Sequence, residues 1–226
     1  MRGNVRQENY GLLLLCYITD RKQFSRDEAT RRWSLLEKIA EAARCGVDFI
    51  QLREKDLSAR ELEAFARQVV GVVRENLRIE NRELRTRLLI NSRTDVALAV
   101  GADGVQLRSD DISPSHVRSI WSQCGAVASP TIGVSCHSVE DVRRAAADGA
   151  DFALFAPVFG KLDAPEIPAV GLQGLGYACK ENVLVFALGG ITLETARACS
   201  DAGAAGVAGI RLFQENDISK VVELLH

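Results

Sequence analysis

Short apolar runs alternate along this chain with longer amphipathic segments. The apolar runs predict eight strands, at 12–19, 49–53, 87–91, 104–107, 131–136, 152–159, 184–188 and 206–210. Most are continuous runs rather than strict alternations, which is typical of parallel strands buried on both faces. The pattern therefore predicts an α/β protein in which helices cover a parallel sheet.

The segments between the strands carry helix signals. A helix is predicted over 35–45, ended by Gly46, and others over 94–100 and 217–225. Ser58 with Glu61 and Ser138 with Asp141 predict capping boxes, and Ser113-Pro114 predicts a capped helix start.

Eight strands, each followed by a helix, predict a single (βα)8 TIM barrel over 1–226, with 1–11 as an N-terminal extension. The stretch 74–87, rich in Arg, Glu and Asn, is interpreted as a helix end plus a loop at the barrel floor. A doubly wound open sheet is the alternative, but no GxGxxG motif follows the first strand, which disfavours it.

The composition and charge of the chain limit the classes of partner that it could bind. The chain has 28 basic and 30 acidic residues, a net charge of −2, so it lacks the bulk positive charge typical of nucleic-acid proteins. Its six cysteines include no CxxC pair, which favours reduced thiols. No signal-peptide pattern or membrane-length apolar run is present. We expect a cytoplasmic protein with no membrane or nucleic-acid partner.

The end of the second strand carries the strongest chemical signal. Gln51, Arg53 and Lys55 share one face, because strand side chains alternate with period two. Two cations on one face of a central strand are costly without a partner. They would form either an interior ion pair with Glu54 or Asp56, or a phosphate clamp, for which Arg offers a planar fork and Lys a point charge.

Polar residues also follow most of the other strands, where TIM barrels place their active sites. Asn91 is either a helix cap or a site residue, and Asp111 is either a helix-dipole partner or a Mg²⁺ ligand. His137 lies just past the fifth strand. The Gly-rich turns at 189–191 and 209–211 offer backbone N–H groups to a phosphate monoester.

Several stretches together resemble the thiamine-phosphate synthase family and its relatives, the thiazole tautomerases. The matching segments span about residues 12–213 and include YITDR at 17–21, QLREKD at 51–56, LLIN at 88–91, VALAVGADGV at 96–105, IGVSCHS at 132–138 and ALGGI at 187–191. The resemblance implies an enzyme, thiamine-phosphate diphosphorylase, that joins an aminopyrimidine diphosphate to a thiazole phosphate and releases pyrophosphate.

The resemblance also implies residue roles. Gln51, Arg53, Lys55, Asn91 and Ser135 would bind the pyrimidine diphosphate, and Arg53, Lys55, Ser135 and His137 would form the catalytic set. Gly190, Ile210 and Arg211 would surround the thiazole phosphate, and Asp111 with Ser92 would mark the Mg²⁺ positions. The partners would be small phosphorylated molecules, and a homodimer is left open.

Two departures from the family pattern leave two alternative functions open. Asn91-Ser92 stands where the family usually has Asn-Asp, so one metal carboxylate is missing. The loop after the sixth strand lacks the usual threonines, and Lys161 would stand in for the family lysine. A thiazole tautomerase, needing no metal and using His137 as acid or base, is one alternative. A non-catalytic phosphate-binding barrel is another.

Overall fold

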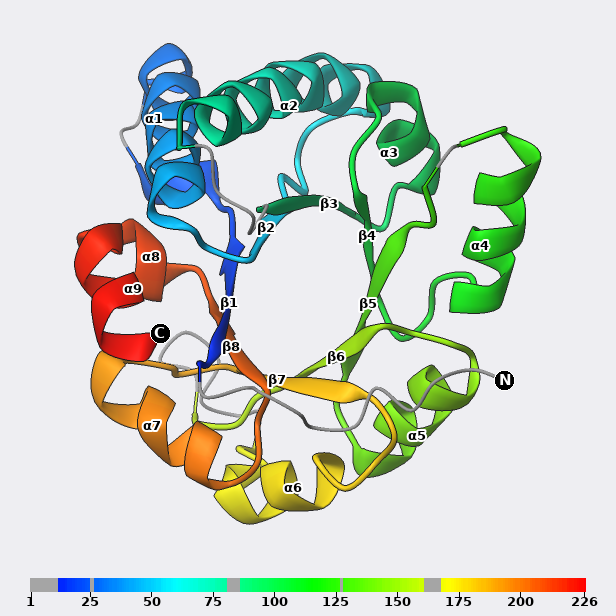
Figure 1. The fold of residues 1–226 in the computed structure, drawn as a ribbon, viewed down its shortest axis with the longest axis vertical. Coiled ribbons are helices and arrows are strands. Elements are labelled where there is room, and N and C mark those ends of the chain that lie inside the picture. The colour runs from blue at the N-terminus through cyan, green and yellow to red at the C-terminus, as the bar shows by residue number, and fades with distance from the viewer. Residues whose placement is uncertain (1–11, 25–26, 81–85, 127, 161–167) are drawn as a thin grey trace.

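The computed structural model describes residues 12–24, 27–80, 86–126, 128–160 and 168–226, so the expected extension at 1–11 lies outside it. The eight strands are parallel, hydrogen-bond in chain order and close into a barrel (Figure 1). They are β1 (Leu14–Ile18), β2 (Phe49–Leu52), β3 (Arg87–Asn91), β4 (Gly104–Leu107), β5 (Thr131–Cys136), β6 (Phe152–Phe155), β7 (Leu184–Leu188) and β8 (Gly206–Gly209). The (βα)8 prediction is confirmed.

Helices form a ring around the barrel (Figure 1). They are α1 (Glu28–Cys45), α2 (Ala59–Glu80), α3 (Thr94–Val100), α4 (Pro114–Gln123), α5 (Val139–Ala147), α6 (Gly171–Ala178), α7 (Leu193–Asp201), α8 (Arg211–Gln214) and α9 (Ile218–Leu225), with a short 3-10 turn, η1 (Arg21–Gln23). Within the described ranges, no helix combines the length and the apolar composition needed to span a bilayer.

The predicted helix signals act as expected at several ends. Ser138 and Asp141 form a reciprocal capping box, and Ser113 caps α4 with Pro114 in its first turn. The prediction for α1 was too short, because Asp27 caps the helix by accepting a hydrogen bond from the Thr30 amide. The predicted β6 was too long, since the strand ends at Phe155. α8 was not predicted, because a four-residue helix has no measurable periodicity.

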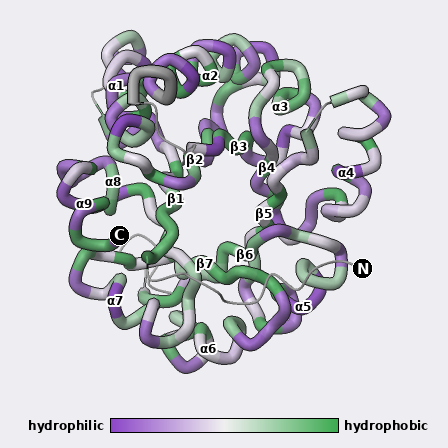
Figure 2. The backbone as a smooth tube through the Cα atoms, in the orientation of Figure 1, coloured by the Kyte–Doolittle hydropathy of each residue, from purple (hydrophilic) through white to green (hydrophobic). Residues whose placement is uncertain are grey.

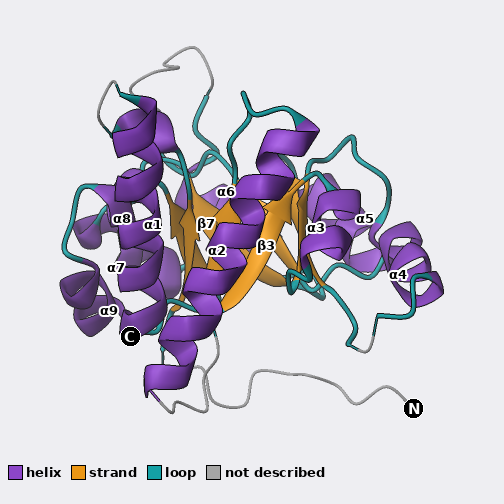
Figure 3. Ribbon diagram, turned by 90° about the horizontal axis from the view of Figure 1, so that it is seen from above, coloured by secondary structure: helices purple, strands orange, loops and turns teal. Residues whose placement is uncertain are grey.

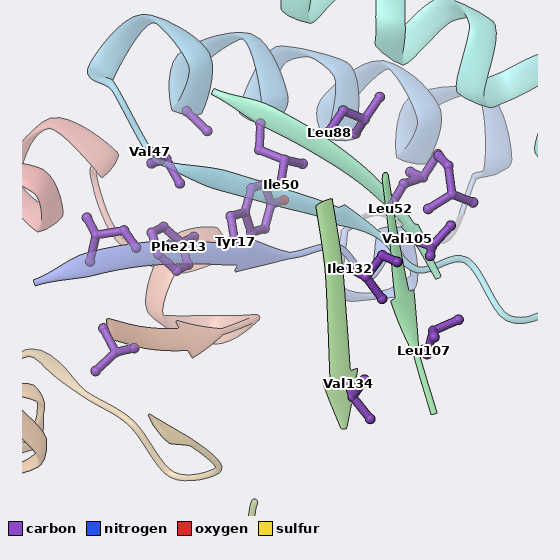
Figure 4. Packing of buried hydrophobic residues seen from close by; sticks show 14 of the residues in the cluster. Tyr17, Val47, Ile50, Leu52, Leu88, Val105, Leu107, Ile132, Val134 and Phe213 are labelled. Carbon is purple, nitrogen blue, oxygen red and sulfur yellow. The ribbon is translucent and has the colours of Figure 1, made fainter. Parts of the chain in front are cut away.

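The main hydrophobic core lies between the barrel and the helices. Strand residues that point outward pack there, and Figure 4 shows Tyr17, Ile50 and Leu52 beside Phe213 and Val105. The Tyr17 and Phe213 rings lie 5.4 Å apart, which joins β1 to α8. Hydrophobic residues dominate the strands β6 to β8, whereas the helices carry many hydrophilic residues (Figure 2).

A second, smaller core fills the barrel interior. The rings of Phe49, Phe152 and Phe186 pack in tilted and edge-to-face arrangements, with centroids 4.9–5.7 Å apart. Glycines make room for them: a Cβ at Gly133 would come within 2.4 Å of Phe152, and one at Gly206 within 2.5 Å of Phe186. The interior is therefore closed by aromatic side chains, and the polar residues farther along the strands lie above that layer.

At the opposite end, three aspartates tie the strands together. Asp48, Asp103 and Asp151 accept hydrogen bonds from the backbone amides of Leu15, Leu88 and Ile132 at 2.8, 2.9 and 2.7 Å. Each aspartate comes just before one strand and bonds to the start of the strand before it. This repeated contact belongs to the floor of the barrel, the end opposite to the one where TIM barrels place their active sites.

Candidate active site

The predicted site residues that the structure describes lie in the last residues of strands or in the segments that follow them. Gln51 and Arg53 lie at the end of β2, Asn91 and Ser92 at the end of β3, and Ser135 near the end of β5. Figure 3 shows the barrel from the side, with loops continuing from the strands inside the ring of helices. Lys161 lies outside the described residues. The fold thus brings segments far apart in sequence to one rim of the barrel.

Arg21 makes the most extensive ionic contacts of this rim. It is 3% exposed, and its guanidinium contacts Glu54 at 3.1 Å, Asp56 at 2.7 Å and Glu28 at 2.9 Å. Thr19 donates a further hydrogen bond of 2.6 Å to Glu54. The Arg21 contact lowers the pKa of Asp56 to about 2, while burial raises the pKa of Glu54 above its ordinary value. Both acids weighed as partners for the β2 cations are thus held by Arg21.

Arg53 is placed differently. Its backbone amide is fixed by the Thr19 hydroxyl at 3.0 Å, and its side chain is half-buried. Burial lowers the pKa of Arg53, partly offset by the charges of Asp20 and Glu54. Across the described ranges, no side chain forms a hydrogen bond or an ion pair with its guanidinium. A partly desolvated cation of this kind is suited to an anionic ligand.

Gln51 and Asn91 form a polar pair across β2 and β3. The Gln51 amide donates a hydrogen bond of 2.8 Å to the Asn91 side-chain oxygen, and Asn91 in turn donates to the Ser92 hydroxyl at 3.2 Å. The Gln51 Oε1 atom is buried and has no partner among the described residues. Ser92 has a left-handed φ of 58°, and its amide donates to the Gln106 carbonyl at 2.8 Å.

Gln106 is a rim residue that the sequence reasoning did not single out. It is 1% exposed, and its side-chain amide donates to Ser135 at 3.2 Å, which joins β4 to β5. A Cβ at Gly133 would come within 2.1 Å of its Oε1 atom, so the glycine leaves space for this side chain. The available signal was a polar residue inside a four-residue apolar strand.

Asp111, expected as a ligand of a magnesium ion, is paired with Arg108. Its Oδ2 accepts the Arg108 amide at 2.8 Å, and its Oδ1 accepts Arg108 Nε and Nη2, both at 3.3 Å. Among the described residues, no group of three or more His, Cys, Asp or Glu side chains could hold an ion. A single carboxylate that is already paired with a guanidinium does not fit a magnesium site built by the protein alone.

His137 has a defined orientation. Its Nδ1 lies 2.8 Å from the Ala156 carbonyl, and its backbone amide donates to Asp141 at 3.1 Å. Because a carbonyl can only accept, Nδ1 carries the proton in the neutral ring, and Nε2 has a free lone pair. The residue is exposed at the rim.

The turns after β7 and β8 complete the rim. Gly190 has a φ of 67°, and a Cβ there would come within 2.7 Å of the Phe159 side chain, so only glycine fits against the segment after β6. The next helix, α7, is capped by Thr192. Ile210 precedes α8, and the exposed Arg211 opens it.

This arrangement is that of a TIM-barrel enzyme with a polar, cationic rim. Residues 15–213 match the family model described as thiamine monophosphate synthase. The chain is 38% identical over 181 residues to the thiamine-phosphate synthase of Syntrophomonas wolfei, covering 78% of this chain and 79% of the relative. It is 37% identical over 196 residues to that of Haloarcula marismortui, covering 84% and 87%.

A solved structure with the same family name also resembles this chain. The thiamine phosphate pyrophosphorylase from Pyrococcus furiosus superposes with a TM-score of 0.74 at 31% identity, covering 94% of this chain and 93% of that one. A 3-hexulose-6-phosphate synthase superposes with a TM-score of 0.62 at 17% identity, a likeness of fold alone. The chain belongs to the thiamine monophosphate synthase family, an enzyme family of thiamine biosynthesis.

Proposed function

We propose that this chain catalyses the synthase reaction, in which an aminopyrimidine diphosphate is joined to a thiazole phosphate with release of pyrophosphate. The observation that carries the proposal is the half-buried Arg53 guanidinium, which has no partner among the described side chains. It follows Gln51 by two residues on one strand face, beside the Gln51–Asn91 pair. An anionic ligand would compensate the desolvation of Arg53.

The proposed chemistry requires no protein nucleophile. The C–O bond between the pyrimidine methylene and the diphosphate breaks, and its electron pair leaves with the pyrophosphate. The thiazole nitrogen then supplies the electron pair of the new C–N bond. Arg53 and Lys55 would stabilise the charge that grows on the leaving group, and Ser135 would bind it on the β5 side. Gln51 and Asn91 would orient the pyrimidine.

The second substrate would bind across the mouth of the barrel. Gly190, Ile210 and Arg211 lie in the turns after β7 and β8, where TIM barrels commonly bind phosphate monoesters. The left-handed backbone at Gly190 and the capped start of α7 support this placement. Lys161 remains a proposed substrate-binding residue.

Magnesium enters the proposal as a companion of the diphosphate. Mg²⁺ usually keeps several waters and uses substrate phosphate oxygens as ligands beside one or two protein carboxylates. Bound there, it would add positive charge beside the leaving group. Asp111 is the carboxylate that the sequence suggests as a ligand of this ion, and in the structure it is paired with Arg108.

The orientation of His137 supports a second candidate, a thiazole tautomerase. A neutral imidazole with its proton on Nδ1 presents Nε2 as a base at the rim. Such an enzyme would move a proton on a thiazole carboxylate phosphate without a metal. The His137→Ala variant would then lose all activity.

Chromatography of reaction mixtures distinguishes the candidates. Purified protein is incubated with both synthase precursors, with each precursor alone, and with the thiazole carboxylate phosphate, each with Mg²⁺ or with EDTA. The proposal expects thiamine phosphate only when both precursors are present. Isomerisation of the thiazole carboxylate phosphate in EDTA, without condensation in any mixture, would replace the synthase by the tautomerase. Binding of thiazole phosphate without either reaction would indicate a binding protein.

A further inference from the structure

Arg108 is paired with Asp111, the carboxylate that was expected to bind a magnesium ion. Strand β4 ends at Leu107, and its alternating residues put Gln106 on the interior face. Position 108 continues that face by one period, at the mouth of the barrel. The Arg108 guanidinium is directed to the Asp111 carboxylate by two contacts of 3.3 Å and lies 3.4 Å from Asp110.

The Arg108 side chain is held but remains accessible. Its side chain is 60% exposed, whereas that of Asp111 is 14% exposed, so the acid is the covered member of the pair. Two of the five guanidinium N–H groups point to Asp111, which leaves others for a further acceptor. The Arg108 amide also donates to Asp111, which fixes the turn that carries the side chain.

A hollow of about 160 Å³ lies beside Arg108, and Ser135 is the proposed diphosphate residue in its lining. Its lining includes Arg108, Asp111 and Ser135, together with Asp141 and Arg144 of α5. The volume has room for about five water molecules or one small anion. Ser135 is bonded to Gln106, so the hollow opens beside the polar group at the ends of β4 and β5.

We infer that Arg108 is a diphosphate-binding residue, positioned by Asp111, and that its guanidinium provides at β4 the positive charge that a protein-held metal ion would otherwise provide. The inference rests on the proposed function and concerns the same site. A guanidinium forms directed, paired hydrogen bonds with phosphate oxygens and needs no hydration shell to be removed as Mg²⁺ does. Pyrophosphate binding should therefore persist without divalent ions.

Calorimetric titration of the full chain with inorganic pyrophosphate tests this inference. In EDTA, the wild-type protein should bind pyrophosphate, and Arg108→Ala should weaken binding at least about tenfold, the usual size of a lost charged hydrogen bond. Added Mg²⁺ should recover part of the loss, because the variant frees the Asp111 carboxylate. Arg108→Lys should fall between the two, since it keeps the charge but not the fork.

Arg144→Ala is the matched control. Arg144 lines the same hollow, and its side chain is 64% exposed and paired with Asp141, as Arg108 is with Asp111. Its removal should change pyrophosphate binding less than about twofold. Equal binding by wild type and Arg108→Ala in EDTA would overturn the inference, as would an equal loss in Arg144→Ala.

The synthase assay separates this inference from the proposed function. Product formation by wild type, with pyrophosphate binding unaffected by Arg108→Ala, would overturn the inference and keep the function. Pyrophosphate binding that depends on Arg108, without product formation, would support the inference and overturn the proposed function. An absence of both binding and turnover in wild type would overturn both. Thermal unfolding of each variant confirms that it is folded.

Discussion

Arg21 Nη1 lies 3.1 Å from Glu54 Oε2, and the two side chains are among the most buried charges in the described part of the chain. This contact joins the segment after β1 to the segment after β2. Thr19 reinforces it by donating to Glu54 and by accepting the Arg53 amide. The residues flanking Glu54, Arg53 and Lys55, are therefore held at the rim by an ion pair that needs no substrate.

Replacing Arg21 should be strongly destabilising. Arg21→Ala leaves the buried Glu54 carboxylate unpaired, for which a loss of about 3–5 kcal/mol in the free energy of unfolding is expected. Adding Glu54→Gln should recover part of the loss, because it removes the orphaned charge. Arg67→Ala, which breaks an exposed pair with Glu63 on α2, should cost about 1 kcal/mol or less. Urea unfolding measures all three, and similar losses for Arg21→Ala and Arg67→Ala would contradict this account.

Asp56 should contribute to the acid sensitivity of the fold. Its pKa is lowered from 3.8 to about 2 by Arg21, so the folded state binds fewer protons than the unfolded state in that window. The stabilisation is complete above the ordinary pKa and is lost as the pH falls towards 2. Asp56→Asn should therefore flatten the pH dependence of the unfolding free energy between about pH 4 and 2. Glu54, present in both proteins, cancels in the comparison, and parallel curves would refute the assignment.

Arg53 should matter for catalysis and not for folding. If it binds the leaving diphosphate, Arg53→Ala should lower kcat/KM by about ten- to hundredfold, since charged hydrogen bonds contribute about 1.5–3 kcal/mol. The unfolding free energy should stay the same or rise, because a partly desolvated charge is removed. Arg60→Ala, an exposed arginine on α2, serves as control. Steady-state kinetics gives kcat/KM, and urea unfolding gives the free energy of unfolding. A loss of unfolding free energy as large as the loss of transition-state stabilisation would indicate a structural role for Arg53.

Two glycines offer a matched test of the barrel interior. Gly133→Ala would place a Cβ 2.1 Å from Gln106 Oε1 and 2.4 Å from Phe152, so a loss of about 1–3 kcal/mol is expected. Gly71→Ala on α2 meets nothing within 4 Å and should stabilise the protein by about 0.5–1 kcal/mol. The two substitutions should therefore shift the melting temperature in opposite directions, as measured by differential scanning calorimetry. Shifts of the same sign would mean that Gln106 and Phe152 move aside without cost.

The barrel could be predicted from the sequence because the signals for strands and helices are local. Capping at Ser138 and the apolar run at 87–91 each depend on neighbouring residues, and both are found as predicted. The ionic contacts of the rim were harder to predict, because their partners are distant in sequence. Arg21 contacts Glu54 and Asp56, from which α1 separates it in sequence. The contact of Arg108 with Asp111 is local in sequence, but it depends on a side-chain orientation that no periodicity encodes.

The formation of one pyrophosphate for each thiamine phosphate, followed by ³¹P NMR in a mixture of both precursors, tests the central claim most directly. The account predicts the two products in equal amounts with the wild-type protein, and a rate about ten- to hundredfold lower with Arg53→Ala. No product above the protein-free control, or an equal rate with Arg53→Ala, would contradict it.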